Sequence, residues 1–230
     1  MNPRVRLFVT ALLFVFVSAL ASLLLLTLLN NHLEDPGLHH LDLATQTRVH
    51  SWTKPGLAEA MLALTWIGSI KIFASALALV LIAFLYWRKF HAAILLTASI
   101  IGAFILNETL KVHFHRTRPH VPWAIGDEHT FSFPSGHSLF AIALYGTLAY
   151  LALLRPTSVF RRLAILLPAL LLVCGIGLSR IYLGMHYPSD VAAGFLVGSL
   201  WFTAIVAVDR AWSSSFFTSP NGRRKELNRR

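Results

Sequence analysis

The sequence predicts an all-α fold, an integral membrane six-helix bundle, and three observations lead to this prediction. Of the 230 residues, 56% are hydrophobic and only 13% are charged, about half the charged fraction of a soluble domain. Several apolar runs reach the roughly 18 to 20 residues that a helix needs to cross a bilayer. Three short clusters of polar and ionisable residues lie between the apolar runs.

Six apolar runs predict the spans, and we expect them to form one transmembrane domain over residues 1–230. The first run begins like a cleaved signal peptide, but it is too long for a signal core, so we expect it to be retained. The six spans are expected at 7–29, 60–87, 92–112, 137–154, 163–181 and 191–208, followed by a basic tail at 213–230.

Lysine and arginine residues predict the orientation. They are frequent before the first span, after the second, between the fourth and fifth, and after the sixth. With six spans these positions share one face, and the positive-inside rule makes it cytoplasmic, so both termini are expected there. Topology thus accounts for much of the net charge of +10, and no nucleic acid partner is expected.

On the outer face, the segment that joins the first two spans contains the stretch LDLATQTRVHSW at residues 41–52. We expect a short amphipathic helix here, lying along the membrane interface with Trp52 at headgroup level.

The first polar cluster is KVHFHRTRP at residues 111–119, at the outer end of the third span. Lys111 and Arg118 are both suited to bind phosphate, and arginine offers a planar fork of donors. Pro119 ends any helix and turns the chain. A basic collar whose side chains reach out to the interface is the alternative interpretation.

The second cluster is FSFPSGHS at residues 131–138, directly before the fourth span. A Pro-Ser-Gly-His sequence at a helix start presents backbone N–H groups and the positive end of the helix dipole, which together form an anion site. Gly136 would allow the backbone to approach an oxyanion closely. An ordinary serine cap followed by an incidental histidine is the alternative.

The third cluster is SRIYLGMHYPSD at residues 179–190. Arg180 lies at the outer end of the fifth span, and the glycine and proline of this stretch suit a turn and the first turn of the sixth helix. His186 and Asp190 are four residues apart, so the carboxylate can accept the imidazole Nδ1–H and leave Nε2 free to attack. A purely structural histidine–aspartate pair is the alternative.

With six alternating spans the three clusters meet at the outer face, where we expect the active site. They supply three cations for phosphate oxygens, a nest of amides and two histidines, one of which has a carboxylate partner. This set fits phosphoryl transfer through a covalent histidine intermediate, in which one histidine attacks and the other protonates the leaving oxygen.

The three clusters resemble the signature motifs of the type-2 phosphatidic acid phosphatase superfamily, all present in order and with intact spacing. The matching residues are Lys111, Arg118 and Pro119, then PSGH at 134–137, then Ser179, Arg180, His186 and Asp190. The six-span hydropathy resembles the membrane branch of the family, so the likeness covers nearly the whole chain.

The resemblance implies a role for each matching residue. His186 would become phosphohistidine, Asp190 would orient it, and His137 would be the general acid. The groups that would hold the phosphoryl oxygens are the side chains of Lys111, Arg118, Arg180 and Ser135 and the amide of Gly136. The family works without a metal, so neither a metal nor another cofactor is expected.

The resemblance also implies a substrate and a location. The short layout is similar to bacterial phosphatases named for phosphatidylglycerophosphate, some of which act on undecaprenyl diphosphate. We therefore expect hydrolysis of a membrane lipid at the outer leaflet of the bacterial inner (plasma) membrane. Undecaprenyl diphosphate is the first candidate substrate, and phosphatidylglycerophosphate or phosphatidate is the second. A lipid phosphotransferase of the same family is an open alternative. No obligatory protein partner is expected.

Two further cations would lie at the rim of the site. Lys71, in the second span, and Arg116, in the first cluster, could each contact a second phosphate or a headgroup, or reach outward to the interface. A transporter would place its polar residues on broken helices at the midplane, whereas the charges here gather at one face. A noncatalytic relative would be expected to lack one of the two histidines, and a related haloperoxidase would be soluble.

Overall fold

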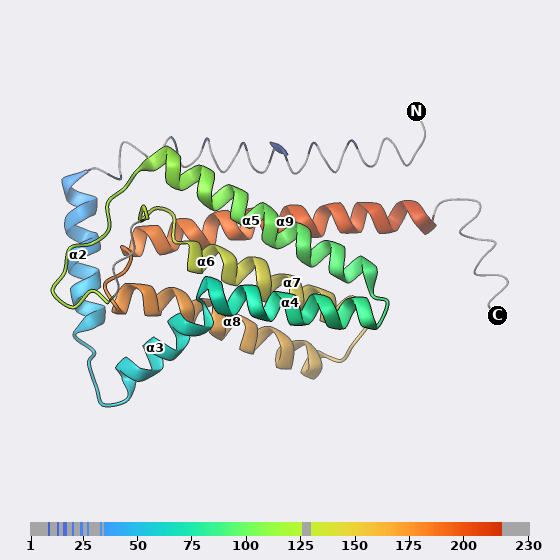
Figure 1. The fold of residues 1–230 in the computed structure, drawn as a ribbon, viewed down its shortest axis with the longest axis horizontal. Helices are drawn as coiled ribbons and strands as arrows, with labels where there is room; N and C mark the ends of the chain where they lie inside the picture. The colour runs from blue at the N-terminus through green and yellow to red at the C-terminus, as the bar shows by residue number, and fades with distance from the viewer. Residues whose placement is uncertain are drawn as a thin grey trace.

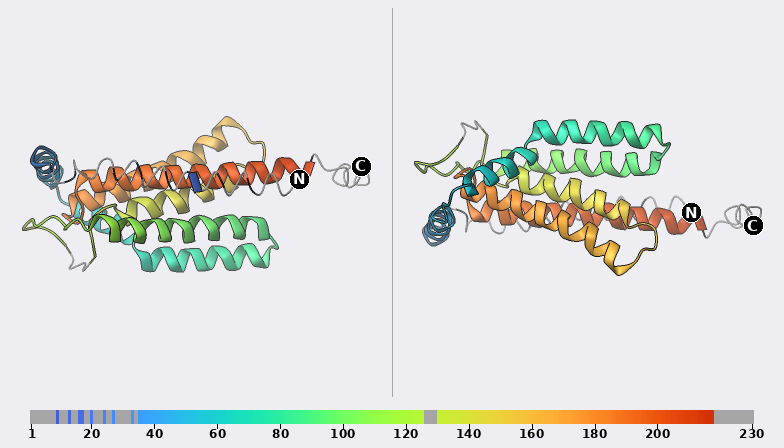
Figure 2. Two further views of the ribbon diagram at one scale, coloured as in Figure 1. Left: turned by 90° about the horizontal axis from the view of Figure 1, so that it is seen from above. Right: turned by 90° about the horizontal axis from the view of Figure 1, so that it is seen from below.

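The computed structural model describes residues 35–125 and 130–217, together with isolated positions between Val9 and Leu33. In the described part of the chain every regular element is helical. The long helices lie side by side in a bundle, and one shorter helix, α2, lies across its end (Figure 1; Figure 2). The prediction of an all-α fold is confirmed.

The elements follow one another from the outer segment to the end of the last helix. They are α2 (Pro36–His50), α3 (Leu57–Ile67), α4 (Ile70–Tyr86), α5 (Phe90–Phe114), α6 (Gly136–Ala141), the π-helical turn η1 (Ile142–Gly146), α7 (Thr147–Ala152), α8 (Val159–Tyr182) and α9 (Pro188–Phe217). Within the described residues, α5, α8 and α9 are long and apolar enough to cross a membrane, and α3 with α4 forms a fourth span if the bent pair is counted as one. The predicted span at 7–29 falls almost entirely outside the described residues, so the count of six remains a prediction.

The predicted span at 60–87 is not one straight helix. α3 and α4 meet at an angle of 51°. Gly68 is the C-cap of α3, and Ser69 caps α4 by accepting a hydrogen bond from the amide of Ile72 at 3.4 Å. A Cβ at Gly68 would lie 2.6 Å from Ile176 and 3.1 Å from His137, so the break depends on a glycine where it packs against the rest of the bundle.

α2 also differs from its prediction, because it begins at Pro36 rather than at Leu41. Asp35 caps the helix by accepting a hydrogen bond from the amide of Leu38 at 3.4 Å, and proline suits the first helical position. Rather than lying only along an interface, α2 contacts α8 and α9 and buries Asp42 and Gln46 against them.

The last helix, α9, runs beyond the predicted end of the sixth span at residue 208. No glycine or proline interrupts the chain between Gly198 and Pro220, and the helix continues to Phe217. The first five residues of the predicted basic tail at 213–230 are therefore helical, and the rest of that tail lies outside the described residues.

Candidate active site

The three polar clusters meet at one end of the bundle. α5 and α8 end there, α6 and α9 begin there, and α2 covers the same end (Figure 1). Lys111 lies in the last turn of α5, His137 in the first turn of α6 and Arg180 in the last turn of α8. Residues that are up to 79 positions apart in the sequence, from Lys111 to Asp190, are thus brought to one place.

His186 and Asp190 lie together in the interior, with 1% and 0% of their surfaces exposed. The imidazole Nδ1 is 3.5 Å from the carboxylate Oδ2. Ser132 links the two, because its Oγ donates a short hydrogen bond to Oδ2 and lies 3.5 Å from Nδ1. The amide of Tyr187 donates to the same carboxylate oxygen at 2.9 Å. The carboxylate therefore faces the Nδ1 side of the ring, as the spacing of four residues predicts.

The other ring nitrogen of His186 faces a cation. Arg118 Nη1 lies 3.3 Å from Nε2 and donates to the carbonyl of Met185 at 2.8 Å. The rest of the guanidinium donates to the carbonyl and the hydroxyl of Thr130, both at 2.9 Å, and Lys111 Nζ reaches the same hydroxyl at 3.4 Å. A guanidinium donor next to Nε2 indicates the tautomer with its proton on Nδ1, which leaves the Nε2 lone pair toward the cations.

The break between α3 and α4 positions two more of the predicted residues. Arg180 is 3% exposed, and its Nη1 donates to the hydroxyl of Thr65 on α3 at 2.7 Å. The ring of His137 lies against Gly68 at the break. His137 is within electrostatic reach of four groups of the site, namely Arg180, His186, Arg118 and Lys111. The bend in the second span thus brings α3 and its C-cap against both Arg180 and His137.

Ser135 and Gly136 form the buried start of α6. The amide of Ser135 donates to the carbonyl of Asp190 at 3.0 Å, which ties this start to the first turn of α9. A Cβ at Gly194 would lie 2.5 Å from the Ser135 carbonyl oxygen, so α9 can come this close only with a glycine. The first N–H groups of a helix lack partners within it, and here they lie at the end of the bundle where the cations gather.

Arg116 does not lie at a rim, and that prediction is wrong. Its side chain is 10% exposed and bridges two buried carboxylates: Nη1 donates to Asp190 at 2.6 Å, and Nη2 donates to Asp42 at 2.8 Å. Buried carboxylates need a compensating charge, and Arg116 supplies it to both. Lys71, the other predicted rim residue, lies in the first turn of α4, with its side chain outside the described part of the structure.

α2 holds the region around His186 through residues that the sequence analysis missed. Asp42 accepts hydrogen bonds from the amide of Ser189 at 3.0 Å as well as from Arg116. Gln46 donates to the carbonyl of His186 at 3.0 Å. Asp42 and Gln46 are four residues apart, so they share one face of α2, and this spacing is the signal that could have indicated a buried polar face.

Comparison with known proteins identifies the family. The model of the PAP2 superfamily matches residues 92–213, which is more than half of the chain. The chain belongs to the PAP2 superfamily. The resemblance noted from the three motifs is thereby confirmed, and the matched region contains all three.

The relatives are named as phosphatases. The phosphatidylglycerophosphatase B of Bacillus subtilis (strain 168) is 30% identical over 158 residues, which make up 68% of this chain and 77% of that protein. A lipid A 1-phosphatase of Rhizobium etli is 39% identical over 92 residues, 40% of this chain and 35% of that protein. This second match therefore spans only about a third of the relative's length.

Solved structures agree with this assignment. A transmembrane PAP2-type phosphatidylglycerolphosphate phosphatase from Bacillus subtilis superposes with a TM-score of 0.71 at 27% identity, covering 91% of this chain and 97% of that one. LpxE from Aquifex aeolicus superposes with a TM-score of 0.57 at 25% identity, covering 72% and 94%. This PAP2 protein is a phosphatase of the membrane branch, and its class as a hydrolase follows from the family and the relatives.

The contacts of Asp42 lead to a prediction for this phosphatase. Asp42→Asn is expected to lower kcat roughly 10- to 100-fold, because a neutral side chain no longer holds Arg116 against Asp190. Losses of this size are typical when a residue that supports a functional side chain is replaced. KM is expected to change less than about threefold, since Asp42 contacts Arg116 and not the cations predicted to bind phosphate. The measurement is the rate of phosphate release in detergent over a range of substrate concentrations.

The matched control is Asp35→Asn, at the exposed start of the same helix. Asparagine is as good an N-cap as aspartate, so kcat is expected to stay within about twofold of the parent protein. Equal losses in both variants, or a change confined to KM, would show that Asp42 does not act by positioning Asp190.

Proposed function

We propose that this PAP2 protein is a lipid phosphatase that works through a phosphohistidine on His186. The observation that supports the proposal best is the environment of this ring, with Asp190 and Ser132 on its Nδ1 side and the Arg118 guanidinium on its Nε2 side. A buried, neutral imidazole in this tautomer has its lone pair directed at the place where a phosphoryl group would be held by cations.

In the first step, Nε2 of His186 attacks phosphorus and the bond between phosphorus and the lipid oxygen breaks. His137 gives a proton to the departing oxygen, and Asp190 stabilises the positive charge that forms on the imidazole. The proposed ligands of the phosphoryl oxygens are Arg118, which exchanges its contact with Nε2 for one with phosphate, together with Lys111, Arg180, Ser135 and the amide of Gly136.

In the second step, water attacks the phosphorus of the phosphohistidine. His137, now neutral, takes a proton from this water, and the bond between Nε2 and phosphorus breaks. Inorganic phosphate leaves, and both histidines return to their starting protonation states. The two steps together consume only the lipid substrate and water, and they use no metal.

The charge state of His186 predicts the acid side of the pH profile. Burial lowers the pKa of His186 to about 4; the hydrogen bond with Asp190 and its charge raise it, and Arg180 and Arg118 lower it further. Attack requires the neutral ring, so activity is lost as the pH falls through this pKa. We expect the acid limb of kcat/KM near pH 4 and not near the ordinary histidine value of about 6.5.

The acid limb of kcat/KM can reflect ionisation of His186 or of the substrate phosphate. Measuring the pH profile with two substrates whose phosphates ionise at different pH distinguishes the two. A limb that moves with the substrate belongs to its phosphate, and a limb fixed near pH 4 belongs to His186. A limb that stays near pH 6.5 for both substrates would contradict the proposed state of His186.

The proposed substrate is a phosphorylated membrane lipid whose headgroup enters from the outer side of the bacterial inner membrane, with both chain ends in the cytoplasm. The positive-inside pattern supports this orientation. The Bacillus subtilis relatives support phosphatidylglycerophosphate at least as well as undecaprenyl diphosphate, which the resemblance placed first.

The test is phosphate release by detergent-purified protein, with EDTA present, from phosphatidylglycerophosphate and undecaprenyl diphosphate side by side. Faster release from the first places the protein in phospholipid synthesis, and faster release from the second places it in recycling of the carrier lipid. Adding an acceptor lipid in the same assay detects phosphotransfer. Release from neither substrate, with phosphate passed to the acceptor, would replace the hydrolase by a transferase.

A further inference from the structure

A cavity of about 860 Å³ extends from Ile142 and Ser199, in the middle of the bundle, toward the end opposite the catalytic residues. Asp209, which lines it, follows Asp190 on the same helix at a distance of roughly 28 Å along the helix axis. The volume is within the range of pockets that hold small molecules. The residues that line it do not include those proposed for catalysis or phosphate binding, so this cavity is separate from the proposed active site.

The cavity exists because two helices diverge. α8 and α9 are joined by a short connection at the catalytic end, and α8 moves away from the bundle toward its first residue (Figure 2). Pro168 lies in this diverging half of α8, where it removes a backbone hydrogen bond and favours a bend. Residues of η1 and α7 line the bottom of the space between the two helices.

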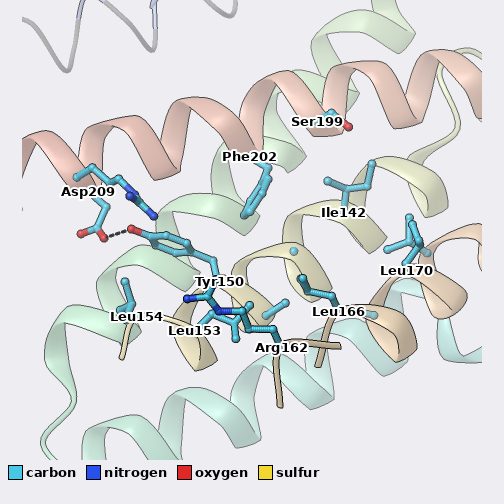
Figure 3. Close-up of a pocket in the computed structure, with 15 residues that line it drawn as sticks. Ile142, Tyr150, Leu153, Leu154, Arg162, Leu166, Leu170, Ser199, Phe202 and Asp209 are labelled. Carbon is cyan, nitrogen blue, oxygen red and sulfur yellow. Dashed lines mark hydrogen bonds between the residues drawn. The ribbon is translucent and has the colours of Figure 1, made fainter. Parts of the chain in front are cut away.

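The lining is amphipathic. Much of the wall is apolar and includes Ile142, Leu166, Leu170 and Phe202, while Tyr150, Arg162, Asp209 and Arg210 line the part nearer the end of the bundle. Figure 3 shows Asp209 and Tyr150 toward one end of the cavity and Ile142 and Leu170 toward the other. Leu166 and Leu170 are 47% and 58% exposed, so the apolar wall opens to the surface that faces the lipid.

The carboxylate in this lining already has hydrogen-bonding partners on neighbouring helices. Asp209 is 3% exposed, and it accepts a hydrogen bond from the Tyr150 hydroxyl at 2.6 Å, while His91 Nε2 lies 2.6 Å from its other oxygen. The Arg210 guanidinium lies 6.0 Å from the centre of the Tyr150 ring. Arg210 and Arg162 are both exposed, so two cations stand at the mouth of an apolar groove.

We propose that this groove binds an anionic phospholipid, with its headgroup phosphate between Arg162 and Arg210 and an acyl chain along the wall between α8 and α9. A phosphate diester and a hydrocarbon chain match the two parts of the lining in charge and polarity. Basic pockets between membrane helices on the cytoplasmic side are suited to such headgroups, and the positive-inside pattern predicts that this end is cytoplasmic.

The test measures lipid binding by native mass spectrometry, with the full chain titrated with phosphatidylglycerol or with zwitterionic phosphatidylcholine. The double variant Arg162→Gln/Arg210→Gln is expected to bind phosphatidylglycerol roughly 30-fold more weakly, because each cation near an anionic headgroup contributes a factor of about five. Binding of phosphatidylcholine is expected to change less than about twofold. The catalytic residues are the same in every variant, so lipid held at the active site contributes equally.

The charge control is Arg88→Gln, which removes a cation from the same end of the bundle but outside the groove.

A pair of tryptophan variants tests the apolar part of the groove without changing its charge. Ala169→Trp fills the groove and is expected to weaken phosphatidylglycerol binding at least about tenfold, whereas Leu167→Trp, on the exposed face of α8, is expected to leave it unchanged.

The proposed lipid site is supported if phosphatidylglycerol binding is lost selectively in the double variant and in Ala169→Trp. Binding that falls equally in the Arg88 variant would show a general surface charge effect and overturn the proposal. Binding that survives in the double variant would overturn it as well. If the double variant does not fold, the tryptophan pair decides, because a groove that accepts Ala169→Trp without loss of lipid does not hold the acyl chain.

Discussion

His186→Asn is expected to lower kcat for phosphate release by at least about 10⁴-fold, as removal of a covalent nucleophile does in other enzymes. Asparagine is close in size and can retain polar contacts, but it has no lone pair able to form a bond to phosphorus at this position. The measurement is single-turnover and steady-state phosphate release in detergent with EDTA, which separates a lost chemical step from a lost binding step.

The matched control for this variant is His40→Asn, an exposed histidine on α2 at the same end of the bundle. Its kcat is expected to remain within about twofold of the parent protein, since exposed side chains away from special contacts rarely matter. Retention of more than about a hundredth of the activity by His186→Asn would rule out His186 as the nucleophile.

The second large effect is expected for Asp190→Asn, with a loss of roughly 10³- to 10⁴-fold in kcat, as for a carboxylate that orients a catalytic histidine. Asparagine can present its N–H₂ group to Nδ1, which favours the tautomer with the proton on Nε2 and removes the attacking lone pair. The change also leaves Arg116 with a single carboxylate, Asp42, so the thermal unfolding temperature is expected to fall.

Comparing the effects of Asp190→Asn on kcat and on KM distinguishes loss of the orienting role from loss of the fold. The cations proposed to hold phosphate are unchanged in Asp190→Asn, so KM is expected to stay within about threefold while kcat falls. A loss that appears wholly in KM, or a kcat within about tenfold of the parent, would contradict the orienting role.

The catalytic candidates could be predicted from the sequence because their signals are local. A spacing of four residues between His186 and Asp190, and the order Pro-Ser-Gly-His before an apolar run, are patterns within single stretches. The apolar lengths likewise indicated where α5, α8 and α9 lie. The structure brings these stretches to one end of the bundle, where His186 does lie beside Asp190.

The supporting groups could not be predicted in the same way because their partners are far apart in the sequence. Asp42 and Arg116 are separated by 74 residues, and nothing local to either indicates the other. Ser132 lies within the second cluster, yet only the fold shows that it links Asp190 to His186. The break at Gly68 is hidden in a continuous apolar run, where hydropathy detects length but not direction.

Trapping the covalent intermediate tests the central proposal most directly. The purified protein is mixed with a lipid substrate labelled in its terminal phosphate, quenched in alkali within milliseconds, where phosphohistidine survives, and mapped by mass spectrometry. The label is predicted on His186 and is expected to be absent from His186→Asn. Phosphate release with no label on the protein, or with the label on another residue, would contradict the mechanism.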